Sequence, residues 1–539
     1  MFNKTKLILF FCLVISIFLH FYKINKVPPC INADEAAFAY NTYSLLKTGK
    51  DEYGNFLPLR FESFKDYKLP AYTYLSIPFI AIFGLNDFSA RALNIVIGVA
   101  FVPLMYFLLK ELFNNRRVSL IGSFLTSLSP GMYILSRHAH EGVVGTFFVL
   151  CALLFLVKYL KTNRLIHFIV SNIFILLNAF SYQTGRIYLI VFFFMYIFIL
   201  FKEGSGKKNL HNSVKKLVIV FAVVFISFFS DFKYGLNRVN NLFFFKNSGF
   251  NLRLTEYLAE QPNRFIHNKI FEGIREVSNR YLYQISSQFL LVSGDTNWRF
   301  GFPNLGLFTP VEFLFFIAGL YYLFKNNERY KYFVLILLLV TPLNNALTWQ
   351  DPSLIRTYPI IFLFLLVAAY GAGNLLHVSR EKKYFIFFAA VLLFFFAFYK
   401  FNDWNLYFHH YPKRAITIRS WQCGYKELVQ YVKDNYNQYD KFYITDRHGQ
   451  PYIFFLYYWP FDPASYQKQA KISGPDKYGF GQIAKFDKFE FHFVYDPKLK
   501  RSVFVGYPES FNEAPPEVLA KIKKITVGGE EIFWIYEQK

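Results

Sequence analysis

Long apolar stretches separated by short polar gaps fill the first 400 residues of the chain. A helix needs about 20 mostly apolar residues to cross the hydrocarbon core of a bilayer. We count eleven candidate stretches, near residues 7–22, 91–109, 118–135, 143–160, 165–181, 187–201, 215–231, 310–324, 331–347, 358–376 and 383–400. The pattern predicts a polytopic α-helical membrane protein with about 11 transmembrane helices.

Basic residues occupy every second gap between these stretches, and the positive-inside rule assigns such gaps to the cytoplasm. We therefore expect a cytoplasmic N-terminus. An odd number of spans then puts the C-terminal part outside the cytoplasmic membrane. The basic gaps hold Lys110, Arg116, Arg117; Lys161, Arg164; Lys202, Lys207, Lys208, Lys215, Lys216; Lys325, Arg329, Lys331; and Arg380, Lys382, Lys383.

The first outer gap, from about residue 22 to residue 90, opens with two adjacent acids, Asp34 and Glu35. From Ala36 onwards, small and aromatic residues recur at i, i+3, i+4 and i+7, which predicts a short helix beside the membrane. The positive pole of its dipole favours an ionised carboxylate in the first turn. The alternative is that both acids are only N-terminal helix charges. The later apolar run 71–85 predicts an interfacial helix.

Beyond about residue 399 the apolar runs shorten to the length of strands, and charge, Pro and Asn increase. Residues 441–445, 491–495, 502–505 and 532–536 predict strands, and 421–436 and 516–522 predict helices. The sequence therefore predicts a transmembrane domain over 1–400 and a small extracytoplasmic α/β domain over 401–539.

The composition agrees with a membrane protein, because 54% of the residues are hydrophobic and 70 are Phe. The net charge of +23 is explained by the basic gaps and does not predict nucleic-acid binding. The first apolar run lacks a small-residue cleavage site, so we expect a retained span. The four cysteines form no metal-type cluster. Cys30 and Cys423 both fall on the outer side, and a disulfide between them stays open.

Short polar motifs recur in the predicted outer gaps: Asp34-Glu35, then Lys68-Leu69-Pro70, then Arg137 to Glu141, then Ser293-Gly294-Asp295 with Asn297 and Arg299. Their order and common outer location resemble glycosyltransferases of the GT-C type. More narrowly, the chain resembles the protein O-mannosyltransferase, aminoarabinose transferase and RgtA/B/C/D-like group (glycosyltransferase family 39-like).

This resemblance implies an enzyme that takes a sugar from a polyprenyl-phosphate carrier and passes it to an acceptor outside the cytoplasmic membrane. The family's catalytic carboxylate corresponds to Asp34. Its second acidic position is usually Asp, and the nearest match here is Glu141, which keeps the charge on a longer side chain. The family lysine that meets the lipid phosphate corresponds to Lys68.

The reaction explains these residue types. A hydroxyl acceptor is a weak nucleophile and needs a base, whereas the departing lipid phosphate needs cations. Asp34 suits the base of a direct displacement with inversion, and Glu141 suits orienting the acceptor or sharing the base role. We also place Glu35 with the catalytic acids. The predicted substrate-binding residues are Lys68, Arg137, His140, Tyr182, Arg186, Asp295 and Arg356.

Each assignment has an alternative. Lys or Arg at a helix end commonly extends to lipid headgroups, and Asp295 could pair with Arg299 for structural reasons. No cofactor is certain; a divalent metal held by His138, His140 and Glu141 is an alternative, although a tight site wants more ligands. The expected partners are the donor, membrane lipids and a protein, lipid or glycan acceptor.

Two rival functions stay open. A transporter or flippase for lipid-linked glycans would place polar residues inside its spans near the midplane. An oligosaccharyltransferase or ligase of related fold would need a divalent metal and more acids in the first loop. That loop does offer Asp51, Glu52 and Asp66.

Overall fold

The computed structural model of the chain describes residues 4–64, 66–203, 210–229, 243–302, 304–349, 352–378, 383–475, 481–493 and 495–539. The basic residues Lys207, Lys208, Arg380 and Lys382 of the predicted cytoplasmic gaps lie outside these ranges. Two compact units form: a helical unit of Met1–Tyr22 with Asn94–Asn405, and a mixed unit of Lys23–Leu93 with Leu406–Lys539. The grouping of residues 23–93 with the C-terminal part differs from the domain boundaries expected from the sequence.

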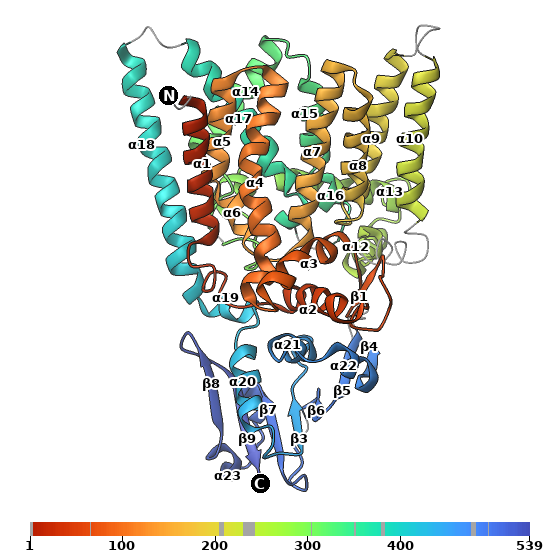
Figure 1. Cartoon of the computed structure of the whole chain (residues 1–539), viewed down its shortest axis with the longest axis vertical. Helices are drawn as coiled ribbons and strands as arrows, with labels where there is room; N and C mark the ends of the chain where they lie inside the picture. The colour runs from red at the N-terminus through yellow and green to blue at the C-terminus, as the bar shows by residue number, and fades with distance from the viewer. Residues whose placement is uncertain are drawn as a thin grey trace. The chain divides into compact units, whose positions relative to one another are not determined.

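The helical unit consists almost entirely of helices, and its long helices other than α12 and α13 run side by side (Figure 1). Its longer helices are α1 (Lys4–Phe21), α4 (Asp87–Phe113, shared with the mixed unit), α5 (Arg116–Leu128), α6 (Pro130–Ser136), α7 (Glu141–Thr162), α8 (Leu165–Ala179), α9 (Gly185–Glu203), α10 (Leu210–Phe229), α12 (Ser248–Glu260), α13 (Lys269–Ile285), α14 (Pro310–Lys325), α15 (Lys331–Val340), α17 (Pro359–Val378) and α18 (Lys383–Asn405). Short elements are η2 (Phe244–Lys246), η3 (Gln288–Ser293), α16 (Leu343–Ala346) and η4 (Leu354–Arg356).

Among the described residues, six helices are long and apolar enough to cross a membrane, and a seventh span results if α5 and α6 count as one. Those two helices bend by 54° at Ser129–Pro130. Every predicted stretch overlaps a helix, but several helices are short; α8 has 15 residues, about 22 Å at 1.5 Å per residue. The chain is a multi-pass membrane protein, whereas the predicted number of 11 spans is not confirmed.

Large apolar side chains remain exposed along the outermost helices of this unit. Phe10 in α1 is 60% exposed, and Phe387 and Phe394 in α18 are 73% and 66% exposed. Exposing such surfaces to water is energetically unfavourable, whereas lipid chains are as apolar as these side chains. The exposed phenyl groups therefore agree with a helix bundle that is surrounded by lipid.

The mixed unit begins with α2 (Ala33–Thr48), the antiparallel pair β1 (Phe61–Ser63) and β2 (Asp66–Lys68), and α3 (Ala71–Phe83), which covers the predicted interfacial run. Its C-terminal part holds a seven-stranded sheet of order β4-β5-β6-β3-β7-β9-β8. The strands are β3 (Lys441–Ile444), β4 (Lys471–Pro475), β5 (Gly481–Phe486), β6 (Phe489–Glu490), β7 (Ser502–Gly506), β8 (Lys523–Val527) and β9 (Glu530–Gln538).

Strand β3 pairs in parallel with both β6 and β7, and the other pairs of the sheet are antiparallel. The helices of this part are α19 (Ala415–Ser420), α20 (Tyr425–Asn435), α21 (Pro451–Tyr458), α22 (Pro463–Gln469) and α23 (Pro516–Leu519), with η5 (Leu406–His410), η6 (Tyr411–Lys413) and η7 (Pro508–Phe511). Three predicted strands correspond to β3, β7 and β9. The prediction at 491–495 is wrong for residues 491–493, because the ladder ends at Glu490; residue 494 is outside the described ranges.

Candidate active site

The helix that carries the paired acids begins with a reciprocal cap. The Asn32 side chain accepts hydrogen bonds from the backbone N–H groups of Asp34 and Glu35, at 2.9 and 3.1 Å. The Glu35 carboxylate in turn accepts from the Asn32 N–H at 3.2 Å. This capping box satisfies helix donors that would otherwise be unpaired. It fixes the predicted start of α2 and places Asp34 in the first turn.

Asp34 pairs with a lysine from the same first loop. Lys68 Nζ lies 2.9 Å from Asp34 Oδ1, at the end of β2. The Lys68 ammonium also lies 4.4 Å from the Phe38 ring centroid and 5.3 Å from that of Phe64. The Lys68 side chain is 8% exposed, whereas the Asp34 side chain is 48% exposed. The pair thus joins a nearly buried ammonium group to a half-exposed carboxylate.

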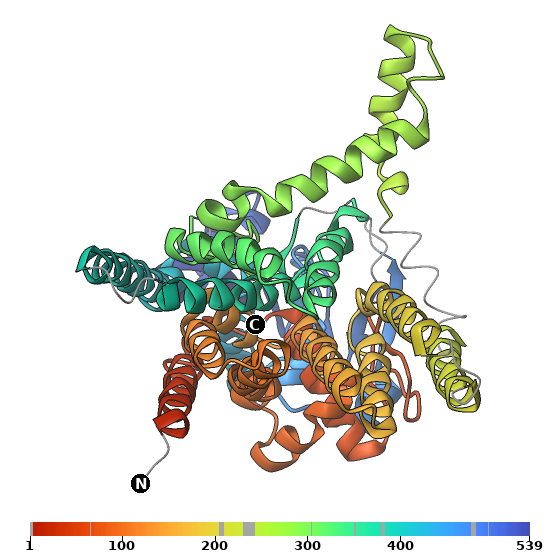
Figure 2. The ribbon, with the colours of Figure 1, turned by 90° about the horizontal axis from the view of Figure 1, so that it is seen from above.

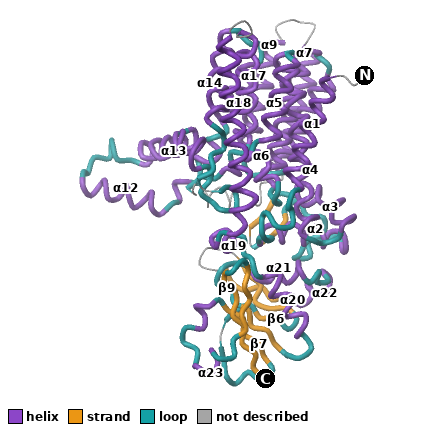
Figure 3. Tube along the Cα trace, turned by 90° about the vertical axis from the view of Figure 1, so that its left-hand side faces the viewer, coloured by secondary structure: helices purple, strands orange, loops and turns teal. Residues whose placement is uncertain are grey.

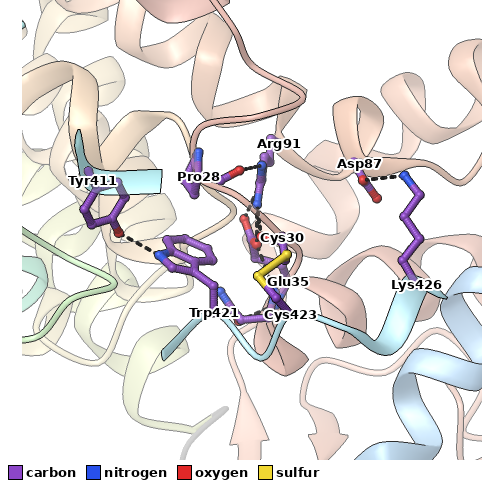
Figure 4. Close-up of a disulfide and its surroundings, with 10 residues drawn as sticks. Pro28, Cys30, Glu35, Asp87, Arg91, Tyr411, Trp421, Cys423 and Lys426 are labelled. Atoms are coloured by element: carbon purple, nitrogen blue, oxygen red, sulfur yellow. Dashed lines mark hydrogen bonds and ion pairs between the residues drawn. A yellow bond between two sulfur atoms is a disulfide. The ribbon is translucent and has the colours of Figure 1, made fainter. Parts of the chain in front are cut away.

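Glu35, which the sequence placed with the catalytic acids, has a different environment from Asp34. It is completely buried, and its oxygens accept from Arg91 Nε and Nη2 at 2.9 and 3.0 Å. Figure 4 shows this pair beside the Cys30–Cys423 disulfide, which lies between segments 393 residues apart. Arg91 also donates to the carbonyls of Pro28 and Cys30. Glu35 therefore positions the start of α2.

A second acid of the first loop, Glu52, is buried in the mixed unit. Burial raises the pKa of its carboxyl to about 8, and the neighbouring Asp51 adds to the rise while Lys68 opposes it. The Tyr452 hydroxyl donates to Glu52 Oε1 at 3.4 Å. Asp51 is engaged in the turn that follows α2, where it accepts from Asn55. Glu52 is thus a carboxylic acid that stays largely protonated near neutral pH.

In the helical unit, the predicted substrate-binding residue Arg137 is directed into the protein. Its side chain is completely buried and donates to the carbonyls of Leu19, His20 and Tyr22, at 2.6 to 2.8 Å. These carbonyls stand at the end of α1, where the last C=O groups of a helix lack intrahelical partners. Arg137 thus caps α1.

The following residues hold the N-terminus of α7. Asn94 donates to the carbonyls of His138 and His140, at 2.8 and 2.9 Å. The His140 ring is the N-cap of α7, and its Nδ1 lies 3.5 Å from Glu141 Oε2. A Cβ on Gly142 would approach the Ile355 carbonyl to 2.9 Å, so α7 and η4 pack closely there. Glu141 therefore stands beside the turn that carries Arg356.

Three of the predicted binding residues line one cavity of about 260 Å³, although Arg356 is far in the sequence from Tyr182 and Arg186. Tyr182, Arg186 and Arg356 contribute an aromatic ring and two guanidinium groups. His140 extends the group, because its ring contacts Tyr182 edge-on at 5.4 Å. Arg356 is held in place by Asn345 Oδ1 and Thr348 Oγ1, each 3.1 Å from Nη1.

The cavity also contains residues that the sequence did not single out: Gln183, Thr184, Ile187, Phe243, Asn344, Leu347 and Thr348. Asn344 is 3% exposed and donates to the Tyr188 hydroxyl. Its Oδ1 has no hydrogen-bond donor among the described residues. Together the amides and hydroxyls suit sugar hydroxyl groups, and the guanidiniums suit an oxyanion. Their closeness in the sequence to Arg186 or Arg356 could have indicated most of these residues, but not Phe243.

Asp295, another of the predicted substrate-binding residues, is 1% exposed. It accepts hydrogen bonds from the backbone N–H groups of Asn297 and Leu354 and from the Ser353 hydroxyl, at 2.8, 2.6 and 3.2 Å. Burial raises the pKa of Asp295 to about 6. Asp295 fixes the start of η4 and so positions Arg356.

The metal alternative gains no support from the geometry. No three His, Cys, Asp or Glu side chains in the described ranges are arranged to hold a metal ion. His138 and His140 instead contact Phe300, with ring centroids 5.8 and 5.6 Å from its ring.

Known proteins resemble this chain in sequence and fold. The family model for dolichyl-phosphate-mannose-protein mannosyltransferases matches residues 68–230. The Bacillus subtilis protein named "Putative mannosyltransferase YkcB" is 26% identical over 224 residues, which are 41% of this chain and 30% of that protein. The chain therefore matches less than a third of the length of this curated relative.

Two solved structures share the fold. ArnT from Cupriavidus metallidurans, bound to undecaprenyl phosphate, gives a TM-score of 0.57 at 8% identity, over 98% of this chain and 97% of ArnT. The oligosaccharyltransferase AglB from Archaeoglobus fulgidus gives 0.50 at 15% identity, over 84% of this chain and 63% of AglB. The resemblance expected from the sequence is thus confirmed: the chain resembles the dolichyl-phosphate-mannose-protein mannosyltransferase family over residues 68–230 and has the fold of GT-C glycosyltransferases.

Proposed function

We propose that this chain is a membrane glycosyltransferase that moves a sugar from a polyprenyl-phosphate-linked donor to a hydroxyl acceptor on the outer face of the cytoplasmic membrane. The observation that carries the proposal is the pair of Asp34 and Lys68. An acid that is half exposed lies 2.9 Å from an ammonium group that is nearly buried. This pair supplies the base and the phosphate cation that the transfer needs.

In the proposed reaction, Asp34 takes the proton of the acceptor hydroxyl while the hydroxyl oxygen attacks the anomeric carbon. The bond from that carbon to the phosphate oxygen breaks, and the polyprenyl phosphate leaves with the bonding electrons. Lys68 stabilises the negative charge that builds up on the phosphate. A single displacement of this kind inverts the anomeric configuration. Because Lys68 is fixed by Phe38 and Phe64, little reorganisation accompanies charge transfer.

The cavity of the helical unit supports the same class of substrate. We assign Arg186 and Arg356 to oxyanion oxygens of the substrate, since guanidinium groups bind phosphate in a bidentate manner. Tyr182 and His140 present polar edges on aromatic rings, which suit contact with a sugar. Glu141, at the start of α7, is proposed to orient the acceptor. Glu35, Arg137 and Asp295 act on the reaction only by positioning.

The disulfide favours the outer side for the mixed unit. Cys30 follows α1 and Cys423 precedes α20, and the bond joins them within this unit. Disulfides persist in oxidising compartments and are rare in the cytosol of mesophiles. The basic gaps of the helical unit favour the same orientation. The ligands of the similar structures, undecaprenyl phosphate for ArnT and a dolichol-phosphate for AglB, support a polyprenyl phosphate here.

The decisive test is transfer of label from radiolabelled polyprenyl-phosphate monosaccharides by membranes that contain the chain. We expect Asp34→Asn to lose most of the turnover while still binding polyprenyl phosphate. Asp434→Asn is the matched control, because Asp434 is an exposed acid of α20 outside the proposed site. Normal transfer by Asp34→Asn would disprove the mechanism. A parallel reaction with a polyprenyl-linked oligosaccharide separates the proposed activity from that of an oligosaccharyltransferase.

A further inference from the structure

A helical arm projects sideways from the helical unit. It comprises Phe243–Ile285, with η2, α12 and α13, and we refer to it as the α12–α13 arm. Figures 2 and 3 show it directed away from the bundle and across the direction of the long helices. Its base is tied to the bundle, since the Tyr281 hydroxyl donates to the Leu339 carbonyl and Gln284 donates to the Pro342 carbonyl.

The two helices of the arm meet through polar side chains. Arg253 of α12 pairs with Glu276 of α13 at 2.7 Å, and Arg280 pairs with the same carboxylate at 2.6 Å. The Arg275 guanidinium lies 5.7 Å from the ring centroid of Tyr257 across the same interface. Two helices that stand in water normally bury their apolar stripes against each other. In the arm Phe244, Phe250 and Leu254 are buried in this way, but the ion pairs add polar side chains to the interface.

Most of the other large apolar side chains of the arm are exposed. The exposed fractions are 61% for Leu252, 81% for Phe265, 50% for Ile266, 71% for Ile270, 55% for Phe271, 60% for Ile274 and 58% for Leu282. Soluble proteins rarely expose so many large apolar side chains on one element. The physical consequence is that some apolar medium or partner must cover this face.

A shallow groove beside this face has hydrocarbon walls. Its volume is about 350 Å³, and it is lined by Phe244, Phe245, Ile270, Gly273, Ile274, Val277 and Ser278. A Cβ on Gly273 would come within 3.0 Å of the Phe244 ring, so glycine allows the close approach of η2 to α13. A groove of this composition suits a flexible acyl chain and offers little to a polar ligand.

Cations border the apolar face. Lys246, Arg264, Lys269 and Arg275 are exposed on the arm, which carries six basic and four acidic side chains between residues 243 and 285. An apolar face with a basic border is the pattern of helices that lie in the headgroup region of anionic bilayers. Since the chain is a multi-pass membrane protein, the headgroup region of a bilayer is always near the arm.

We propose that the α12–α13 arm is a lateral membrane anchor: it lies in the boundary between headgroups and acyl chains of an anionic bilayer, with Phe265, Ile270 and Ile274 inserted. The arm then holds the loops that follow it, including the loop of Asp295, at a fixed depth. This inference does not depend on the proposed transferase activity.

The test places one fluorophore on each face of α13 in the full-length chain. Ile270→Cys reports the apolar face, and Asn279→Cys, also exposed, reports the polar face of the same helix. Unmodified chain gives the labelling background, because Cys12 and Cys151 are buried and the other two cysteines are bonded. Each variant carries a bimane label in nanodiscs of phosphatidylethanolamine and phosphatidylglycerol, with or without brominated acyl chains.

We expect brominated lipid to quench the label at residue 270 several-fold more than the label at residue 279, and the emission at residue 270 to shift to the blue. Equal, weak quenching at both positions would overturn the proposal. A different result is a label at residue 270 that is shielded from water but not quenched by brominated lipid. If that shielding is lost when each nanodisc holds one protein molecule, a second copy of the protein covers the face. That result would also overturn it.

Discussion

Arg91 donates hydrogen bonds to both carboxylate oxygens of Glu35, at 2.9 and 3.0 Å. Glu35 directly follows Asp34, the acid that we place in the reaction. Consecutive residues of a helix point about 100° apart. The first turn of α2 therefore turns Glu35 into the protein and leaves the Asp34 side chain 48% exposed. We therefore propose separate tasks for the two acids, a structural one for Glu35 and a chemical one for Asp34.

This separation predicts opposite results for two neutral substitutions. Glu35→Ala should lower the stability of the chain by about 3–5 kcal/mol, because Arg91 would be left as a buried charge without its partner. Asp34→Asn should unfold near the temperature of the unmodified chain, because its amide oxygen can still accept the hydrogen bond of the nearly buried Lys68 ammonium. Thermal unfolding of the purified protein in detergent measures both. A Glu35→Ala chain that is fully stable but cannot transfer sugar would instead place Glu35 in the reaction.

Arg137 and Arg356, both predicted from the sequence to bind substrate, should also give different results when substituted. Arg137→Ala should lower the unfolding temperature, since three carbonyls at the end of α1 lose their donor. Arg356→Ala should leave the fold intact and weaken binding of polyprenyl phosphate, by roughly 1.5–3 kcal/mol if one charged hydrogen bond is lost.

Unfolding temperature and carrier affinity, measured on the same preparations, distinguish these outcomes. Arg299→Ala serves as the control, because Arg299 is a loop arginine that does not line the cavity. An Arg356→Ala chain with unchanged affinity would remove Arg356 from the substrate site, whatever the result for Arg137.

The sequence predicted features that depend on local pattern. Apolar length located the helices, and helical spacing located α2 with Asp34 in its first turn. The order of the motifs indicated the family resemblance that the family model supports. The sequence did not predict which charged side chains are buried. Glu35, Arg137 and Asp295 each bind partners distant in the chain, and a motif carries no information on such partners.

The same limit explains the domain boundaries. Residues 23–93 group with the C-terminal part through contacts such as the Cys30–Cys423 bond, which spans 393 residues. Helix α21 (Pro451–Tyr458) was also missed, because its short run of apolar residues has no helical period and is buried on nearly every side.

Glu52 predicts how stability changes with pH. Its pKa is about 8 in the folded chain, against an ordinary value of 4.5. The folded state therefore keeps a proton that the unfolded state releases as the pH rises between these values. Between the two pKa values, the free energy of unfolding should fall by about 1.4 kcal/mol for each pH unit. Unfolding temperatures at pH 5, 6.5 and 8 measure the slope.

Glu52→Gln tests the assignment of that slope to one residue. The amide keeps an acceptor for the Tyr452 hydroxyl and cannot titrate. The loss of stability between pH 5 and pH 8 should therefore become smaller in this variant. If the slope is unchanged, another group dominates the pH dependence, and Glu52 is not the buried acid responsible.

The disulfide provides a test of orientation. If the mixed unit faces outward, Cys30 and Cys423 become reactive in intact cells after treatment with a reductant that does not cross membranes, and an impermeant maleimide then labels them. Cys12 and Cys151 are buried in the helical unit and serve as internal controls that stay unlabelled. Cys423→Ser should leave Cys30 reactive without reductant. If labelling requires permeabilised cells, the mixed unit lies in the cytoplasm. Asp34 and Lys68 belong to the same unit as the disulfide, so this result would also disprove the proposed transfer on the outer face.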